Sequence, residues 1–212
     1  MKGNGPETIE EWWDACHTGI HPETDFFLTG HQGPDVWNYL QIKHLIKSDI
    51  NVLNIGVGKG HCTRNLAALG CRVSALDISS AALNKVKDIT AGTYLANALN
   101  KIPENHFDIA ISFLVVQHMD NISLSSQLSA IFKALKPGGL FAFQYSFPLE
   151  PNLPTSPGNT ELCKIGGVTR SSLEMGTLCK NAGFINKKDW IHSEYPQFGS
   201  GWRIIHLKKP NK

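Results

Sequence analysis

The sequence predicts an α/β fold: a doubly wound, mostly parallel sheet of seven strands with helices on both faces, an antiparallel last strand and an N-terminal helical cap. Between residues 51 and 147, short apolar runs alternate with segments whose apolar residues recur at helical spacing. This alternation indicates repeated βα units, which build a parallel sheet covered on both faces. Two later apolar runs, residues 184–193 and 202–208, suit an antiparallel pair at one end of the sheet.

Each predicted strand is a short apolar run bounded by turn-forming residues. Before the final pair, the strands are expected at residues 51–56, 71–77, 93–98, 107–113 and 140–147. The run FDIAISF is apolar along its length rather than alternating, so we expect it to be buried on both faces. The helices are expected at residues 36–46, 60–70, 79–89, 123–136 and 168–184. Pro137 to Gly139 would end the fourth helix sharply, and Thr169 would cap the fifth.

Composition excludes several classes of protein. A chain of 212 residues that is 42% hydrophobic and 18% charged can bury a large core and is not disordered. Its net charge of +2 is too small for a protein that holds nucleic acid by electrostatics. No apolar run approaches the roughly 20 residues of a membrane span, and the polar N-terminus lacks a signal-peptide core, so we expect a cytoplasmic protein. Five cysteines without a C-x-x-C pair indicate reduced thiols, and no metal site is predicted.

We expect a single domain over residues 1–212. Its parts would be a helical cap or lid at 1–50, a cofactor-binding core at 51–147, a substrate loop at 148–168, and a final helix and strand pair at 169–212. The substrate loop is rich in proline and too long for a simple connector. Loops of this kind in compact domains usually cover a site.

A glycine loop and an aspartate predict an adenosine-type cofactor. Gly56, Gly58 and Gly60 lie between a strand and a helix, where they permit positive φ and let a ligand lie on the backbone. Asp77 ends the next strand, where its carboxylate can accept hydrogen bonds from both hydroxyls of a ribose. A nicotinamide dinucleotide and S-adenosylmethionine both suit these residues. The dinucleotide fingerprint G-x-G-x-x-G requires glycine where this chain has His61, so the spacing favours S-adenosylmethionine.

Four segments resemble motifs of the class I S-adenosylmethionine-dependent methyltransferases of the small-molecule type. They are VLNIGVGKG (52–60), VSALDIS (73–79), FDIAISFLVVQHM (107–119) and LKPGGLFAF (135–143), and the likeness resumes in residues 166–184. The resemblance implies that the three glycines pass the methionine part of the cofactor along their backbone. It also implies that Asp77 holds the ribose and that Ile78 packs on the adenine.

The resemblance implies further cofactor contacts, two of them at positions where this chain departs from the family. Asn97, with Ala98, falls where the family often has an acidic residue at the adenine amino group, and an Asn oxygen can still accept there. Asn54 stands where the first motif usually carries Asp or Glu near the methionine amino group. Phe113 and Leu114 should line the cofactor at the end of their strand.

Three side chains are candidates for the chemistry. Methyl transfer needs the acceptor, the methyl group and the sulfur in line, and an oxygen acceptor of high pKa also needs a base. His118 is the leading candidate, with a structural or cofactor-shaping role as its alternative. His31 lies on a glycine-rich segment that would fold over the cofactor, and a satisfied turn histidine is its alternative. Tyr145 could orient an acceptor hydroxyl from the end of its strand, or simply pack.

The leader contributes aromatic residues and two more histidines. Trp12 and Trp13 are adjacent, so on a helix one faces the core while the other flanks the cleft or an oligomer contact. His17 and His21 have the spacing of a metal pair, but nearby glycine and proline argue against a regular helix there.

We therefore predict transfer of a methyl group from S-adenosylmethionine to a small-molecule acceptor, at a hydroxyl oxygen of a sugar or another natural product. An RNA or protein methyltransferase would carry a basic stripe or a motif such as N-P-P-Y where this chain has FLVVQH. A non-catalytic S-adenosylmethionine-binding regulator is a third hypothesis, which Asn54 supports. No nucleic-acid or membrane partner is predicted, and a homodimer is left open.

Overall fold

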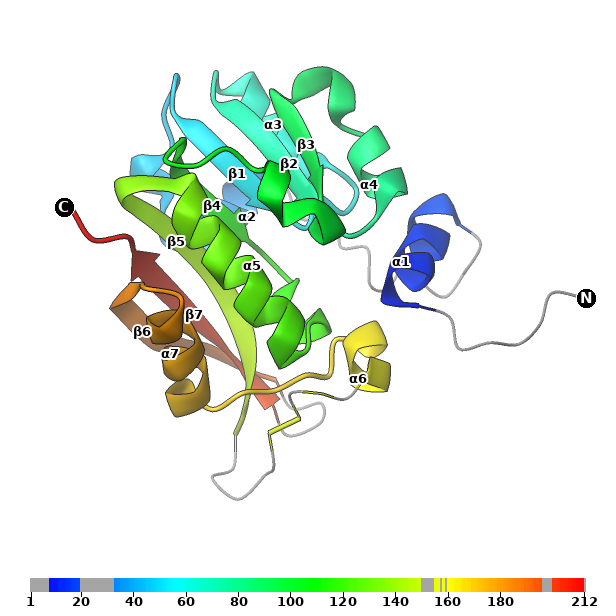
Figure 1. Ribbon diagram of the computed structural model, residues 1–212, viewed down its shortest axis with the longest axis vertical. Coiled ribbons are helices and arrows are strands. Elements are labelled where there is room, and N and C mark those ends of the chain that lie inside the picture. The colour runs from blue at the N-terminus through cyan, green and yellow to red at the C-terminus, as the bar shows by residue number, and fades with distance from the viewer. Residues whose placement is uncertain are drawn as a thin grey trace, which may run out of the picture.

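The structure is a computed structural model, and it describes residues 8–19, 33–149, 155–156, 158, 160–195 and 200–211. Its centre is one seven-stranded sheet with the strand order β3-β2-β1-β4-β5-β7-β6 (Figure 1). The strands are β1 (Asn51–Ile55), β2 (Arg72–Asp77), β3 (Gly92–Leu95), β4 (Phe107–Ser112), β5 (Leu135–Pro148), β6 (Ile185–Tyr195) and β7 (Ser200–Lys208). β1 to β5 pair with one another in parallel, and β7 is antiparallel to both β5 and β6. The predicted fold class is confirmed.

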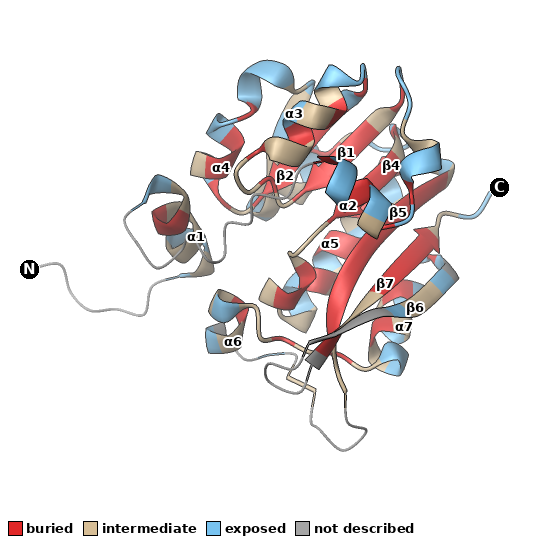
Figure 2. Cartoon of the chain, turned by 180° about the vertical axis from the view of Figure 1, so that it is seen from behind, coloured by how far each residue is buried: buried red, intermediate tan, exposed pale blue. Residues whose placement is uncertain are grey.

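Helices cover both faces of this sheet. They are α1 (Ile9–Thr18), α2 (Gly33–Tyr39), α3 (His61–Ala68), α4 (Ser80–Asn84), α5 (Asn121–Ala134), α6 (Thr160–Ile165) and α7 (Ser172–Asn181), with 3-10 turns η2 (Lys43–Leu45), η3 (Lys87–Ile89), η4 (Ala96–Lys101) and η5 (Val116–His118). On one face, Leu128 of α5 and Met175 of α7 join an apolar cluster with β5. On the other, Trp37 of α2 and Leu66 of α3 pack against β1 and β4. Figure 2 shows the buried residues concentrated along the central strands and the inner sides of the helices.

Two predicted helices are shorter than their apolar spacing indicated. In the segment where a helix was predicted over residues 36–46, α2 ends at Tyr39. Gln41 then adopts a φ of 56°, and the chain continues into the 3-10 turn η2. The helix predicted over residues 79–89 contains α4 followed by η3. In both segments most apolar residues still face the core, although Ile89 at the end of the second is exposed.

The carboxyl ends of β1, β2 and β4 meet at one edge of the sheet. The chain continues from β1 to β2 on one side and from β4 to β5 on the other, and ligands of open α/β sheets bind at such a switch point. The helix α1 packs beside this edge, against α4 and α6. Its first turn is fixed by a capping box in which Thr8 and Glu11 exchange side-chain and backbone hydrogen bonds.

No helix within the described ranges is both long enough and apolar enough to cross a membrane.

Candidate active site

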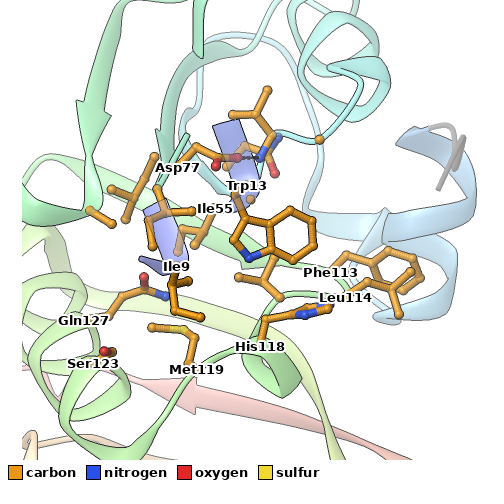
Figure 3. Close-up of a pocket in the computed structure, with 18 of the residues that line it drawn as sticks. Ile9, Trp13, Ile55, Asp77, Phe113, Leu114, His118, Met119, Ser123 and Gln127 are labelled. Atoms are coloured by element: carbon orange, nitrogen blue, oxygen red, sulfur yellow. Dashed lines mark hydrogen bonds between the residues drawn. The ribbon is translucent and has the colours of Figure 1, made fainter. Parts of the chain in front are cut away.

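A cavity of about 470 Å³ lies over the switch point (Figure 3). Its walls come from the ends of β1, β2 and β4, from η4 and η5, and from the first turns of α5. Ile9, Trp13 and His17 of α1 close one side, and Cys163 of α6 adds to another. The volume lies within the range of small-molecule and cofactor pockets.

The glycine loop presents bare backbone to this cavity. Gly56 and Gly58 line it, with φ values of 75° and 57°. A side chain at Gly56 would collide with Val115, whereas one at Gly58 would meet no protein atom within 4 Å and would project into open space. The space over Gly58 is therefore available to a ligand that lies on the backbone. Gly60 does not line the cavity, and it is the N-cap residue of α3, with a φ of 81°.

Asp77 is held by the backbone that surrounds it. One carboxylate oxygen accepts a hydrogen bond from the Val57 amide at 2.6 Å, and the other accepts one from the Ser79 amide at 2.9 Å. Burial raises the pKa of Asp77, and these backbone N–H groups act in the opposite direction. Each carboxylate oxygen can accept a second hydrogen bond. Asp77 also lines the cavity, so it is a fixed acceptor pair for a ligand with two hydroxyls.

Asn54, in β1, is buried in the cavity wall. Its Nδ2 donates to the hydroxyl of Thr63 in α3 at 2.8 Å. This contact fixes the amide plane and leaves its oxygen as the group that a ligand can use. Asn54 therefore offers an uncharged acceptor where a carboxylate would offer a negative charge.

The apolar end of the cavity is formed by residues after β2 and β3. Ile78, Ala96, Asn97 and Leu99 line it, and this set can hold a flat ring between apolar side chains with one amide at the edge. Ala98, where the chain departs from helical geometry with φ of −129° and ψ of 40°, does not line the cavity.

At the end of β4 the chain turns sharply over the cavity. Leu114 has a φ of 58°, in the left-handed region that residues with a side chain rarely adopt. Phe113, Leu114 and Val115 all line the cavity, and the ring of Phe113 meets Tyr39 of α2 edge-on at 5.1 Å. Strained backbone of this kind persists only where the surrounding structure fixes it, and it is common at ligand sites.

His118 faces the same space from η5. Its Nδ1 lies 2.9 Å from the carbonyl oxygen of Cys163, so Nδ1 must donate, and in the neutral ring Nε2 carries the lone pair. Trp13 of α1 meets the imidazole edge-on at a ring distance of 4.8 Å (Figure 3). Burial lowers the pKa of His118 to about 4, although hydrogen bonds to backbone carbonyls act to raise it. The imidazole is therefore neutral at pH 7 and can accept a proton only at Nε2.

We expect the fold to lose stability as pH falls from about 6.5 to 4. The pKa values of His118 and His17 are both lowered to about 4 by burial, whereas histidines of the unfolded chain titrate near 6.5. The unfolded state then binds more protons in this window, so the stability present above pH 6.5 is lost on acidification. Urea unfolding at pH 7 and pH 5 measures the loss. In the variant His118→Gln the free energy of unfolding should fall less between pH 7 and pH 5, by about 1 to 2 kcal/mol. This difference is smaller than the full pKa shift of His118 implies, because the ring is only half-buried. An equal loss in both proteins would contradict the assignment.

The part of α1 that lines the cavity was only partly predicted. Trp13 flanks the cleft, as one of the two adjacent tryptophans was expected to do. The α1 helix is regular to Thr18, and Gly19 caps it, so the glycine ends the helix and does not disrupt it. Asp14 fixes α1 to the N-terminus of α4, where it accepts hydrogen bonds from the Ser79 hydroxyl and the Ala81 amide. Nothing in the local pattern around Asp14 indicated this long-range contact.

Of the other two catalytic candidates, the structure places Tyr145 away from the cavity and does not describe His31. Tyr145 is fully buried within β5, and its hydroxyl donates to Asp189 at 3.2 Å, so it packs in the core. Tyr145 was expected where the chain leaves this strand, but β5 continues to Pro148 because it pairs with β7 from Leu140 to Pro148. His31 lies outside the described residues, as does His21. Within the described ranges, no three His, Cys, Asp or Glu side chains gather as a metal ion would require.

Comparisons with known proteins agree with this geometry. Residues 53–143 match the family model described as a methyltransferase domain. An uncharacterized methyltransferase of Synechocystis sp. is 32% identical over 114 residues, which cover 52% of this chain and 54% of that protein. A malonyl-[acyl-carrier protein] O-methyltransferase of Pectobacterium atrosepticum is 34% identical over 99 residues, which cover 45% of this chain and 38% of that protein. The chain thus spans about half or less of the length of these relatives.

A solved structure extends the likeness of the fold to nearly the whole chain. It is phosphoethanolamine N-methyltransferase 2 of Haemonchus contortus, in complex with phosphomonomethylethanolamine and S-adenosylhomocysteine. The TM-score is 0.70 at 20% identity, over 96% of this chain and 60% of that one. At this identity the likeness concerns the fold.

Proposed function

We propose that this protein binds S-adenosylmethionine in the cavity and methylates a small-molecule acceptor at a hydroxyl oxygen, because residues 53–143 match the methyltransferase domain family. The observation that carries the proposal is the bare backbone at Gly58 beside the anchored carboxylate of Asp77. The two features suit the methionine and ribose parts of one ligand. Relatives named as O-methyltransferases support oxygen as the accepting atom.

The residues of the cavity fit the cofactor part by part. The space over Gly58 would be filled by a side chain at that position, so glycine keeps it open. Asp77 offers two fixed oxygens for the ribose hydroxyls, and Ile78 and Leu99 offer apolar surface for the adenine. Asn54 would hold the methionine amino group through its amide oxygen. When bound, the cofactor supplies an activated methyl group on a positively charged sulfur.

The side chains around His118 would hold the acceptor. Trp13 and Phe113 form aromatic walls, and α1 shields the cavity from water on one side. The Nε2 lone pair of His118 is the group that can receive the acceptor proton as the oxygen attacks. An imidazole with a pKa of about 4 is a weak base, so it suits a hydroxyl that is itself acidic. We therefore favour a phenolic or enolic hydroxyl, with a pKa of about 10 or lower, over a sugar alcohol.

Two measurements test the proposal in sequence. Calorimetric titration with S-adenosylhomocysteine tests the cofactor, and absence of binding would overturn it. Incubation with radiolabelled S-adenosylmethionine and separate metabolite, RNA and protein fractions then tests the acceptor. Label in the metabolite fraction is expected, and label only in RNA or protein would favour the macromolecular alternative. Cofactor binding without any transfer would identify a non-catalytic binding protein, the role that the uncharged Asn54 favours.

Once an acceptor is found, the role of His118 can be measured. The variant His118→Gln should lower kcat about 100-fold, because the proton acceptor is lost while the ring volume is roughly kept. Affinity for S-adenosylhomocysteine should change less than about 3-fold, since the glycine loop and Asp77 are untouched. A kcat within about 3-fold of the wild type would leave His118 with the cofactor-shaping role only.

A further inference from the structure

Arg170 is a buried arginine beneath the connection between β4 and α5. The residue is only 1% exposed. Its side chain donates hydrogen bonds to uncharged oxygen atoms, all of which belong to residues 116–121. Its Nε donates to the Asn121 side-chain oxygen at 2.7 Å. One terminal nitrogen donates to the Met119 carbonyl at 2.6 Å, and the other donates to the Val116 carbonyl at 3.3 Å. The planar guanidinium thus binds both ends of a single short turn.

This turn is part of the cavity wall. It contains η5, and His118, Met119 and Asp120 all line the cavity. A buried guanidinium is costly unless its donors are satisfied, and an apolar side chain of similar volume often stabilises a core as well or better. Among the described ion pairs none involves Arg170, and the hydrogen bonds of its side chain all go to the turn itself. Burial lowers the pKa of Arg170, and the nearby charge of Glu174 acts to raise it.

Residues 163–170 hold the same turn at further points. The Val168 amide donates to the Gln117 carbonyl at 3.1 Å, and the Cys163 carbonyl accepts from His118. Gly166, with a φ of 70°, packs so closely that a Cβ there would lie 2.7 Å from Cε1 of His118. Arg170 itself is fixed to β5 by its amide, which donates to the Ser146 carbonyl at 2.9 Å. The imidazole is thereby enclosed by a segment that ends in the arginine.

We propose that Arg170 is a positioning residue of the methyl-transfer site, which fixes the 116–121 turn and so the place and tautomer of His118. The inference rests on the proposed function. The guanidinium matters here through geometry: its planar fork reaches two carbonyls and one amide oxygen at once, which a lysine ammonium on a flexible stem does not reproduce. Loss of the fork frees the turn, and His118 then loses its alignment with the Cys163 carbonyl.

The test measures the tautomer of the His118 imidazole by nitrogen NMR in the wild type and in the variants Arg170→Met and Arg170→Lys. In the wild type the tautomer protonated at Nδ1 should dominate. In Arg170→Met the signals should move toward the tautomer mixture of free imidazole, and Arg170→Lys should lie between the two. The signals of His206, which is buried and bonded to the Leu40 carbonyl away from the cavity, should stay unchanged in both variants.

Arg203→Met is the matched control. Arg203 is also largely buried, and it pairs with Asp189 at 2.8 Å on the far side of β5, so its loss should lower stability without changing His118. With a known acceptor, Arg170→Met should lower kcat at least 10-fold while affinity for S-adenosylhomocysteine changes less than 3-fold. An unchanged His118 tautomer in either Arg170 variant that folds overturns the inference, as does an equal change in Arg203→Met. Failure of the proposed function would appear instead as absent cofactor binding in the wild type, whatever the imidazole signals show.

Discussion

Replacing Asp77 with alanine is expected to weaken binding of S-adenosylhomocysteine at least about 100-fold. Two hydroxyl donors on one carboxylate form charge-assisted hydrogen bonds, each worth about 1.5 to 3 kcal/mol. Loss of both therefore costs about 3 kcal/mol or more, which is roughly two decades in Kd. The variant also removes the acceptors of the Val57 and Ser79 amides, so the glycine loop loses part of its support. Calorimetry of the variant and the wild type at one pH measures the difference.

Asp108→Ala is the matched control for this prediction. Asp108 is likewise a carboxylate that accepts from a backbone amide of the sheet, that of Asn51 at 2.8 Å, and it also pairs with Lys136. It lies at the opposite edge, where β4 begins, and does not line the cavity. Asp108→Ala should lower the unfolding temperature and leave the affinity unchanged. Equal affinity losses in the two variants would mean that Asp77 acts through the fold, and undiminished affinity in Asp77→Ala would remove it from the ribose site.

The sequence was informative about the fold because each strand is an apolar run with its own boundary. The run at 107–113 and the glycines after Ile55 placed β4 and β1 to within a residue or two. Boundaries went wrong where no local signal exists. Nothing in the sequence around Gln41 indicates its positive φ. Pairing of Leu135 with Phe107 of β4 and of Pro148 with Ser200 of β7 extends β5 beyond the predicted 140–147.

The candidate site divides in the same way. The proposed cofactor side comes from strand ends and from the turns that directly follow them, so Gly56, Gly58 and Asp77 could be placed from spacing alone. The acceptor side depends on contacts between distant segments. The hydrogen bond from His118 to Cys163 spans 45 residues, and those of Arg170 to the 116–121 turn span 49 to 54. A lone arginine before a helix carries no pattern that predicts burial. Tyr145 was expected where the chain leaves its strand, but it pairs with Arg203 of β7 inside β5.

Gly58→Ala is expected to reduce cofactor affinity about 10- to 100-fold while the protein stays folded. The φ of 57° at Gly58 costs an alanine roughly 1 to 2 kcal/mol, and the added methyl group meets no protein atom within 4 Å. The fold therefore tolerates the change. Because Gly58 lines the cavity, however, the methyl group should displace a ligand that lies directly on the loop backbone. Calorimetry with S-adenosylhomocysteine, alongside thermal unfolding, separates these two effects.

Gly19→Ala is the matched control, because it should lower stability through the same backbone strain without weakening cofactor binding. Gly19 has a φ of 76°, meets no atom within 4 Å, and lies past the end of α1, outside the cavity wall. The two variants should lose similar stability, and only Gly58→Ala should lose affinity. Equal affinities would place the ligand away from the loop, so that the glycines would serve only the tight turn between β1 and α3. A selective loss at Gly58 would instead locate the methionine part of the cofactor on this backbone, next to the carboxylate of Asp77.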